Sequence, residues 1–546
     1  MNKESGERFL IETHINLLHV ACGWGKAIIA LLLLFPSTMF SQHSTLTLSL
    51  SEYENKVQAV WAAQMIGALM GFPFEHKVSS VQTIDQFTLK TGYIPVDDDW
   101  YYEMVAVRAF EKYGFDMSLE DLGKQWVENS AGTWGSSEQT LGLLKKGISA
   151  EQCGHPQYNK LWFSIGPQFS ADVYGALAPG MPNVAAALAG KYGRINGYAE
   201  GLDGAVFIAG MISLGFKENN TPDIVRKAAS LIDPRSPYRQ CLDLVIEQAS
   251  GRKTFREVVN AVEDRWHIEY PATNNAVANG GIVAACVWFG KGDFLTTINL
   301  AFQAADFTDA DCNAANAGAV VAAMKGLEGI PQHLLQTLGD TIAGEKMGSL
   351  ALTPAVHESL KELSRRTAVI GKKILIKNGA RISNQQLVIP WEPLQTQPSA
   401  LFTLADLMRY WNPDWKMERA GFGGAGGGMG GIRGMTYLNG NMLATYPRDE
   451  VRGLVLTRSV TLADEKRLVL EVGADSARCW ELNIFVNNNR LIRKVIEGNG
   501  PGQTWYSVEA DLSPYQNQAI TIRLYQRVLL KGKEAGNAYW KSITLR

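Results

Sequence analysis

The sequence has no Cys-x-x-Cys pair and no long run of basic residues. Its six cysteines are scattered over 546 residues, which argues against a zinc knuckle or a disulfide framework. The formal net charge is −2 at pH 7, so nothing indicates nucleic acid as a partner. The chain is 46% hydrophobic and 19% charged, as is ordinary for a globular protein, and it is long enough for two or three domains.

Lysine and arginine are also missing between Lys291 and Lys325, and two carboxylates lie in that gap. Asp309 and Asp311 stand one residue apart, just before a segment (314–323) that is too rich in alanine to face water. Buried carboxylates must be paired or must hold a metal ion. Because the sequence offers no local cation to pair with them, this stretch favours a metal site.

A second acidic cluster, Asp97-Asp98-Asp99, also opens a predicted helix. One aspartate is a favoured helix N-cap, which is the simpler interpretation. Three adjacent aspartates repel each other, however, and hard cations prefer several carboxylate oxygens. We therefore expect the two clusters to meet around a hard divalent cation. Glu75 follows a break at 72–74, where a solvated loop and a functional role are equally consistent with the pattern.

The N-terminus has the pattern of an export signal. Lys26 precedes an apolar run (27–35), and Pro36 breaks the chain after it. The run is too short for a comfortable membrane span. We expect residues 1–42 to be a signal peptide or an N-terminal anchor. We expect the mature protein to be secreted or periplasmic, with no stable membrane span after signal removal.

Two regions of different character follow. From Ser51 to about Lys373, apolar residues recur at helical spacing and no strand-like alternation appears. We expect an all-α domain over 51–380 in which polar loops converge at one end. Residues 381–440 have the composition of a linker, and their Gly-rich loop lacks the Lys-Ser/Thr tail of a phosphate loop.

The C-terminal region indicates strands. Apolar residues alternate with others over 480–486 and 520–524, and Asn488-Asn489 marks a turn. Short strands separated by turns predict a smaller all-β, jelly-roll-like sandwich over 441–546. A carbohydrate-binding module and a packing domain are equally consistent with this pattern.

Three blocks, taken in order, are similar to a known family. They are 67–75, 97–99 and 309–315. Together they resemble the ADP-ribosylglycohydrolase superfamily, the dinitrogenase-reductase-activating type of hydrolase, over roughly Val57 to Arg366. This resemblance implies an all-α fold and one or two Mg²⁺ ions, with Mn²⁺ or Ca²⁺ as alternatives. It also implies hydrolysis at the anomeric carbon of a ribose.

The resemblance also assigns roles to individual residues. The implied metal ligands are Asp97, Asp98, Asp99, Asp309, Asp311 and Cys312, and the implied catalytic residues are Glu75, Asp98 and Asp311. Cys312 replaces the family's Ser or Thr, and a neutral thiol is a poor ligand for Mg²⁺. Asn196-Gly197 replaces the family's Ser-His or Thr-His pair near the substrate.

Polar loops before buried helices supply the candidate substrate-binding residues. These are Trp134, Gly135, Glu200, Asp203, Asn274 and Asn275. The sequence thus predicts an exported, divalent-metal-dependent glycoside hydrolase that acts on an ADP-ribosyl group, another furanoside or a glycan. The alternative is a catalytically inactive member of the fold that binds a metal or a ligand. A third interpretation is a Ca²⁺ ion held purely for stability.

Overall fold

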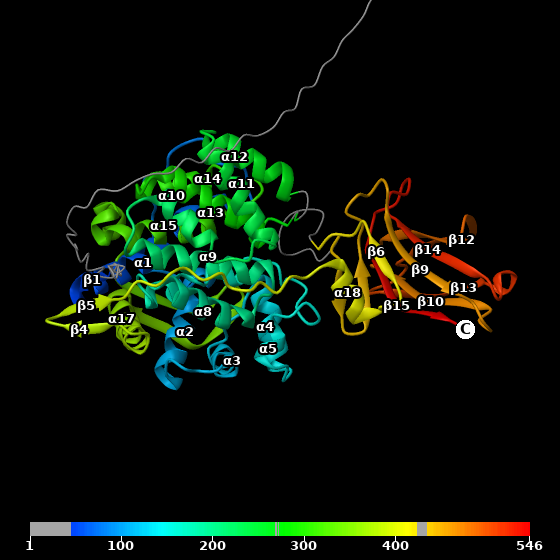
Figure 1. Ribbon diagram of the computed structural model, residues 1–546, viewed down its shortest axis with the longest axis horizontal. Coiled ribbons are helices and arrows are strands. Elements are labelled where there is room, and N and C mark those ends of the chain that lie inside the picture. Colours follow the sequence, from blue (N-terminus) through cyan, green and yellow to red (C-terminus); the bar gives the residue numbers. More distant parts are fainter. Residues whose placement is uncertain (1–44, 268–269, 271, 423–433) are drawn as a thin grey trace, which may run out of the picture. The chain divides into compact units, whose positions relative to one another are not determined.

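The computed structural model describes residues 45–267, 270, 272–422 and 434–546. Helices dominate the N-terminal part of the chain and strands the C-terminal part (Figure 1). This confirms the predicted order of a helical domain followed by a β-sandwich. The predicted signal segment (1–42) and the Gly-rich loop (423–431) lie outside the described residues.

The helical domain contains a long series of helices, most of them joined by short loops, with a long connection between Glu75 and Asp97. Their bounds are α1 Leu50–Gly71, α2 Asp98–Tyr113, α3 Leu119–Glu128, α4 Gly135–Lys145, α5 Ala150–Cys153, α6 Gly166–Phe169, α7 Asp172–Leu177, α8 Pro182–Tyr192, α9 Glu200–Gly215, α10 Thr221–Ala229, α11 Pro237–Ser250, α12 Phe255–Val262, α13 Ala276–Gly290, α14 Phe294–Phe302, α15 Ala310–Lys325, α16 Gln332–Leu338 and α17 Leu360–Lys377. Helix α18, Leu404–Trp411, follows in the predicted linker.

Helices α1, α9, α13 and α15 form the core of this domain (Figure 1). Most of their residues are apolar or small, and nearly every residue of α13 and α15 is buried, as is typical of a helix without a solvent face. With the adjoining residues to Phe74, α1 is long and apolar enough to cross a membrane. Most of it is buried among the other helices, so its apolar character is explained by the core.

Helices α1 and α15 approach so closely that their backbones touch. A Cβ added at Gly67 would lie 2.6 Å from the carbonyl oxygen of Ala314. A Cβ at Gly71 would lie 2.5 Å from the Cα of Asp311. These two glycines therefore fix the distance between α1 and the N-terminal turn of α15.

A β-hairpin interrupts the region that the sequence predicted to be wholly helical. Its strands are β2 (Thr341–Met347) and β3 (Leu350–Ser359). The backbone N–H of Ile94 donates to the carbonyl of Thr341 at 2.8 Å, so β2 holds the segment that leads into Asp97. Sequence periodicity missed the hairpin because most of β3 is exposed and offers no apolar alternation.

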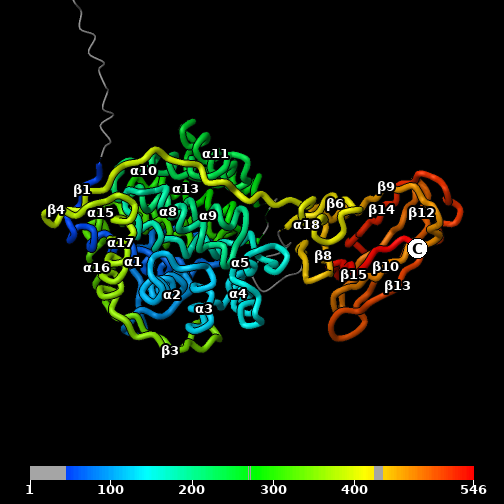
Figure 2. Tube along the Cα trace, turned by 60° about the horizontal axis from the view of Figure 1, so that its bottom comes forward, coloured from blue at the N-terminus to red at the C-terminus, as the bar shows by residue number. Residues whose placement is uncertain are grey.

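The ends of the helical domain are joined by a small sheet. Strand β1 (Leu46–Ser49) pairs with β5 (Gln386–Ile389), and β5 pairs with β4 (Arg381–Ser383). The chain then runs along the helical domain (Figure 2), where the N–H of Gln397 donates to the carbonyl of Leu231 at 2.7 Å. Part of the predicted linker, 381–440, is therefore attached to the helices.

The β-sandwich consists of two antiparallel sheets, in the strand orders β13-β10-β15-β8-β7 and β12-β11-β14-β9-β6. Their bounds are β6 Lys416–Glu418, β7 Tyr437–Asn439, β8 Met442–Thr445, β9 Leu454–Thr461, β10 Arg467–Ala474, β11 Cys479–Val486, β12 Asn489–Glu497, β13 Thr504–Asp511, β14 Ala519–Arg527 and β15 Ala538–Leu545. The sandwich thus includes β6 and β7, which precede the predicted boundary at 441. Short strands of three residues carry too little alternation to be recognised.

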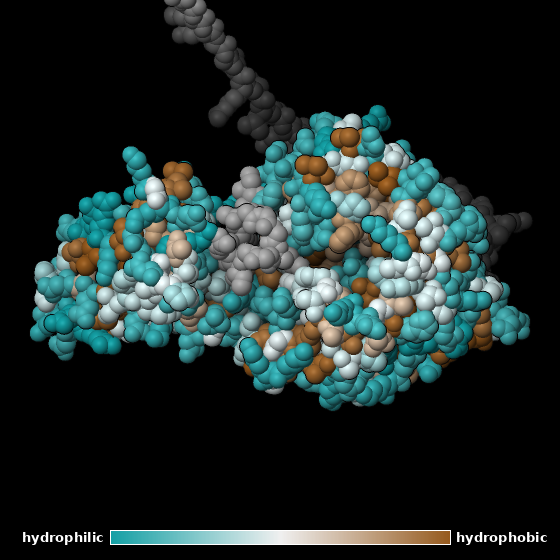
Figure 3. All heavy atoms as spheres, turned by 180° about the vertical axis from the view of Figure 1, so that it is seen from behind, coloured by the Kyte–Doolittle hydropathy of each residue, from teal (hydrophilic) through white to brown (hydrophobic). Residues whose placement is uncertain are grey.

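The two sheets enclose the apolar residues of the segment that was predicted to be a strand at 480–486. Trp480, Leu482 and Ile484 on β11 are fully buried, and the rings of Trp480 and Trp540 lie 5.1 Å apart between centroids. The face of the protein in Figure 3 is mainly hydrophilic, with hydrophobic side chains in small patches. The expected alternation of buried and less buried residues holds along β14, but on β11 Glu481 and Asn483 are buried as well, so the alternation of residue type there is not one of exposure.

The α1–α15 contact gives a stability prediction. Gly67→Ala should lower the free energy of unfolding by about 1–3 kcal/mol, because the new methyl group overlaps the backbone of α15. Urea unfolding followed by circular dichroism measures the change. Gly142→Ala in α4 is the matched control: nothing lies within 4 Å of the added Cβ, so the better helix former should stabilise by at most about 1 kcal/mol. Equal stabilities of the two variants would contradict the close contact.

Candidate functional site

The two acidic clusters lie at the N-termini of two different helices. Asp97 is the N-cap of α2, and its Oδ1 accepts from the N–H of Asp99 at 3.3 Å. Asp309 is the N-cap of α15, and its Oδ1 accepts from the N–H of Cys312 at 3.3 Å. Both helices therefore present carboxylates at the positive end of their dipoles, where negative charge is stabilised.

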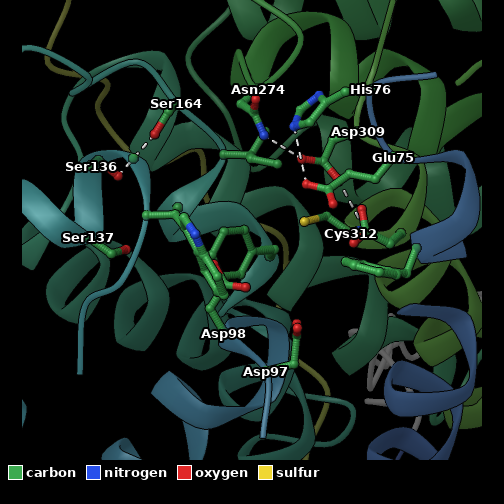
Figure 4. Close-up of a pocket in the computed structure, with 17 residues that line it drawn as sticks. Glu75, His76, Asp97, Asp98, Ser136, Ser137, Ser164, Asn274, Asp309 and Cys312 are labelled. Carbon is green, nitrogen blue, oxygen red and sulfur yellow. Dashed lines mark hydrogen bonds and ion pairs between the residues drawn. The ribbon is translucent and has the colours of Figure 1, made fainter. Parts of the chain in front are cut away.

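Both clusters face one pocket of about 370 Å³ (Figure 4). The predicted site residues that line it are Glu75, Asp97, Asp98, Trp134, Gly135, Asn274, Asp309, Asp311 and Cys312. Asp99 does not line the pocket and is only 1% exposed, and the Cys312 thiol and the Asp311 carboxylate both influence its pKa. The structure thus brings the whole predicted metal-ligand set together.

Burial makes these carboxylates difficult to ionise. It raises the pKa of Asp97 to about 6 and that of Asp309 to about 7. Burial, followed by the charges of neighbouring carboxylates, raises the pKa values of Asp98, Asp99 and Asp311 well above the usual range. Like charges in a low-dielectric site each disfavour ionisation of the others. A cation in the pocket would reverse that effect.

The donor set fits a divalent cation. Asp99 Oδ1 and Asp311 Oδ1 are buried and have no hydrogen-bond partner among the described residues. The described lining also contains no lysine or arginine that could neutralise the carboxylates. Buried charges without a protein partner are those that coordinate metals. Asp309, Asp311 and Cys312 offer ligand atoms that lie within 4.8 Å of one another.

Cys312 is the unusual member of this set. Its side chain is 8% exposed, and burial raises the pKa of the thiol well above its usual range. The protonated thiol interacts with the carboxylates of Asp99 and Asp309 and lowers the pKa of each. Sγ therefore faces the acidic cluster, as the resemblance implied for the residue at this position.

Hydroxyl groups line the side of the pocket opposite the carboxylates (Figure 4). Ser164 Oγ donates to Ser136 Oγ at 3.0 Å, and Asn196 Nδ2 donates to Ser137 Oγ at 2.9 Å. Asn196, which stands where the resemblance expects a Ser-His or Thr-His pair, therefore positions a pocket serine without lining the pocket itself. The Trp134 ring is 37% exposed beside these serines.

Three predicted substrate-binding residues lie outside the pocket lining. Glu200 accepts a hydrogen bond from Tyr270 Oη at 2.7 Å, and burial raises its pKa to about 7. Asp203 accepts from Ser399 Oγ at 2.6 Å, which ties the linker to α9. Asn275 is the N-cap of α13. A polar residue before a buried helix bonds to other protein groups as readily as it binds substrate. Asn275 satisfies backbone groups, whereas Glu200 and Asp203 accept from side-chain hydroxyls.

His76 and Ser164 line the pocket but were missed by the sequence analysis. His76 Nε2 lies 3.1 Å from Glu75 Oε1. Its position directly after Glu75 was the only local signal. Ser164 lies in the segment before α6, and this segment packs beside the start of α13. The N–H of Ile165 donates to the carbonyl of Asn274 there, at 2.9 Å, and this contact brings Ser164 to the pocket. Such a contact between distant segments has no local sequence signature.

A helical domain that gathers carboxylates from two helix N-termini around one pocket has the features expected of a divalent-cation site. The ADP-ribosylglycohydrolase family matches residues 49–367, more than half of the chain, so the chain belongs to this family. We therefore assign the chain to the hydrolases of the ADP-ribosylglycohydrolase type. No curated protein sequence matches the chain.

Several solved structures are similar at low identity. A structure described as "ADP-ribosylglycohydrolase-related protein complex" is 15% identical with a TM-score of 0.39, over 59% of this chain and 99% of that one. One described as "CBM4 structure and function" is 13% identical with a TM-score of 0.18, over 24% and 87%. A cycloisomaltooligosaccharide glucanotransferase of Paenibacillus sp. is 14% identical with a TM-score of 0.15, over 24% and 17%. Scores this low carry no argument about function.

The buried carboxylates give a prediction about metal and stability. Asp311→Asn should raise the melting temperature of the EDTA-treated protein at neutral pH, because burial and neighbouring carboxylates raise the pKa of Asp311, so that folding without a cation costs the uptake of a proton that asparagine does not need. Mg²⁺ or Mn²⁺ at about 100 times its dissociation constant should then stabilise the wild type by about 2.7 kcal/mol but leave the variant unchanged. Thermal scanning with and without the cation measures both effects. Equal stabilisation of the two proteins would contradict a cation site at Asp311.

Proposed function

We propose that this protein is an exported, divalent-metal-dependent glycoside hydrolase that directs water to the anomeric carbon of a glycosyl group. One observation carries the proposal: carboxylates from α2 and α15 converge on a single pocket, and two of their buried oxygens have no partner among the described residues. Family membership supports the reaction class. Export rests on the N-terminal sequence pattern.

Mg²⁺ is the proposed cation, with Mn²⁺ and Ca²⁺ as the alternatives, because the ligands are mainly carboxylate oxygens. The residues that would hold it are Asp97, Asp98, Asp99, Asp309 and Asp311. A bound divalent ion supplies Lewis-acid chemistry: it orients sugar hydroxyls and water, and it offsets the repulsion among the carboxylates.

Glu75 is the proposed general base. It lines the pocket, and 29% of its side chain is exposed, so a water molecule in the pocket can reach it. The water oxygen bonds to the anomeric carbon as its proton passes to Glu75. The leaving oxygen keeps the electrons of the broken C–O bond and takes a proton from solvent. A carboxylate within hydrogen-bond reach of the attacking water contributes about 10²–10⁴-fold to such a step.

The pocket suits a neutral glycosyl group better than a diphosphate. Trp134 and Phe72, exposed by 37% and 59%, offer aromatic faces, and the three serines offer hydroxyl groups. Diphosphates are usually held by Arg and Lys, and the described lining contains neither. We therefore favour a furanoside or a glycan end over an ADP-ribosyl group. The ADP-ribosyl group remains the second candidate because it gives the family its name.

An activity assay tests this function. Purified mature protein, loaded with Mg²⁺ or Mn²⁺, is offered p-nitrophenyl furanosides, arabinan-type oligosaccharides and an ADP-ribosylated arginine peptide. Glu75→Gln should lower kcat by at least about 10²-fold with little change in KM, because the variant cannot accept the proton of the water. Glu138→Gln is the matched control, since Glu138 is an exposed acid on the first turn of α4 and does not line the pocket.

Full activity of Glu75→Gln would exclude Glu75 as the base. Metal binding without turnover of any of these substrates would favour the inactive, ligand-binding alternative. Cleavage of only the ADP-ribosylated peptide would show that the substrate preference argued above is wrong.

A further inference from the structure

One sheet of the sandwich, β12-β11-β14-β9-β6, has one side toward the core and one side away from it (Figure 1). Trp480, Leu482 and Ile484 of its central strand β11 are fully buried between the two sheets. Successive side chains of a strand point to opposite sides, so Glu481 and Asn483 lie on the side away from the core. We call this side the outer sheet face.

The strand register determines which side chains share the outer sheet face, because residues directly opposite each other point to the same side. Glu481 lies opposite Arg527, and Phe485 lies between Arg490 and Arg523 on the two neighbouring strands. The same register gives five basic residues on this face, Arg490, Arg493, Arg523, Arg527 and Lys416, and two acidic residues, Glu481 and Glu418. The face therefore carries an excess of positive charge.

One of these cations is neutralised by an acid of the same face. Arg493 Nε donates to Glu481 Oε2 at 2.8 Å. Arg490, Arg527 and Lys416 are exposed and form no ion pair among the described residues.

Arg523 is also left without an acid. Its Nη2 donates to the carbonyl of Asn487 and, at 3.3 Å, to Asn488 Oδ1, and its Nε has no partner among the described residues. Four cations of the outer sheet face thus have no acidic partner, against one unpaired acid, Glu418.

Aromatic and polar groups lie among these cations. The half-buried rings of Phe485 and Tyr525 are 5.5 Å apart between centroids. Asn483 Nδ2 donates to Glu481 Oε1 at 2.9 Å, and these two side chains are only 4% and 3% exposed although they point away from the core. Neighbouring side chains of the face enclose them, so the face is a packed surface with fixed polar groups.

We propose that the outer sheet face binds an acidic polysaccharide through the carboxylates of its uronic-acid units. Three of the four cations without an acidic partner are arginines, whose planar guanidinium group matches a planar carboxylate in a bidentate arrangement. Tyr525 and Phe485 offer apolar ring surface between them for the sugar rings. The inference goes beyond the proposed hydrolysis, and no residue of this face lines the acidic pocket.

The spacing of the cations favours a polysaccharide over a nucleic acid. Arg490 and Arg523 are two strands apart, or about 10 Å at the backbone, and Arg523 and Arg527 are four residues apart along β14, or about 14 Å. Double-stranded DNA carries one negative charge per about 1.7 Å of its axis. A uronic-acid chain has at most one charge per sugar unit, so its sparser carboxylates suit this arrangement better.

The test measures binding of the full chain to polygalacturonate and to its carboxyl-reduced, neutral form, by affinity electrophoresis and calorimetry. EDTA in every solution prevents divalent cations from bridging the polymer to acidic groups. The main variant is Arg490→Gln with Arg527→Gln, which removes two exposed cations that form no ion pair among the described residues. The matched control is Lys466→Gln with Lys531→Gln, since both lysines are exposed and lie outside the strands of the sandwich.

The wild type and the lysine control should bind polygalacturonate and leave the carboxyl-reduced polymer unbound. The arginine double variant should lose at least about tenfold in affinity, because arginine and tyrosine side chains dominate binding surfaces of this kind. Tyr525→Ala should lose at least about fivefold, whereas Tyr525→Phe should retain most of the binding. Circular dichroism checks that each variant is folded.

Wild-type affinity in the arginine double variant would overturn the inference, as would equal binding of the neutral polymer. Binding of duplex DNA or anionic vesicles in place of polygalacturonate would also overturn it and would assign the face to another polyanion. Failure of the proposed function is distinguishable from these results. A protein that binds polygalacturonate but hydrolyses none of the glycosides keeps this inference and loses the hydrolase proposal, and the reverse pattern does the opposite.

Discussion

The backbone contact between α1 and α15 is the constraint on which the site depends. Where Gly71 ends α1, a Cβ would lie 2.5 Å from the Cα of Asp311, so no side chain separates the two helices. Glu75 follows immediately after the turn η1, and Asp309 and Asp311 stand on the first turn of α15. The contact therefore sets the distance between the proposed base and the acidic cluster.

A second constraint is electrostatic. Buried carboxylates from two helix N-termini repel each other, and burial, together with the charges of neighbouring carboxylates, raises the pKa values of Asp97 and Asp309 to about 6 and about 7. Proteins rarely retain such an arrangement without a compensating charge. A cation between the two clusters would remove the repulsion and would leave the hydroxyl- and aromatic-lined half of the pocket for a substrate. In the proposed function, stability and activity would then depend on the same ion.

The sequence revealed the parts of this arrangement that have a local signature. The acidic clusters, the buried character of α15 and the alternation on β11 all follow from residues adjacent in the chain. Other features depend on contacts between distant segments. The β2–β3 hairpin, the serine side of the pocket and the outer sheet face of the sandwich belong to this class, as do the structural positions of Glu200, Asp203 and Asn275. A polar residue at the start of a buried helix has the same sequence pattern whether it binds a ligand or bonds to other groups of the protein.

The central claim is that a divalent cation lies between the N-termini of α2 and α15. Anomalous X-ray scattering from crystals soaked in Mn²⁺ locates the ion directly. The account predicts a peak within about 2.0–2.6 Å of carboxylate oxygens of Asp98 or Asp99 and of Asp309 or Asp311. A fully occupied peak elsewhere, or no peak in the pocket at saturating Mn²⁺, would contradict it.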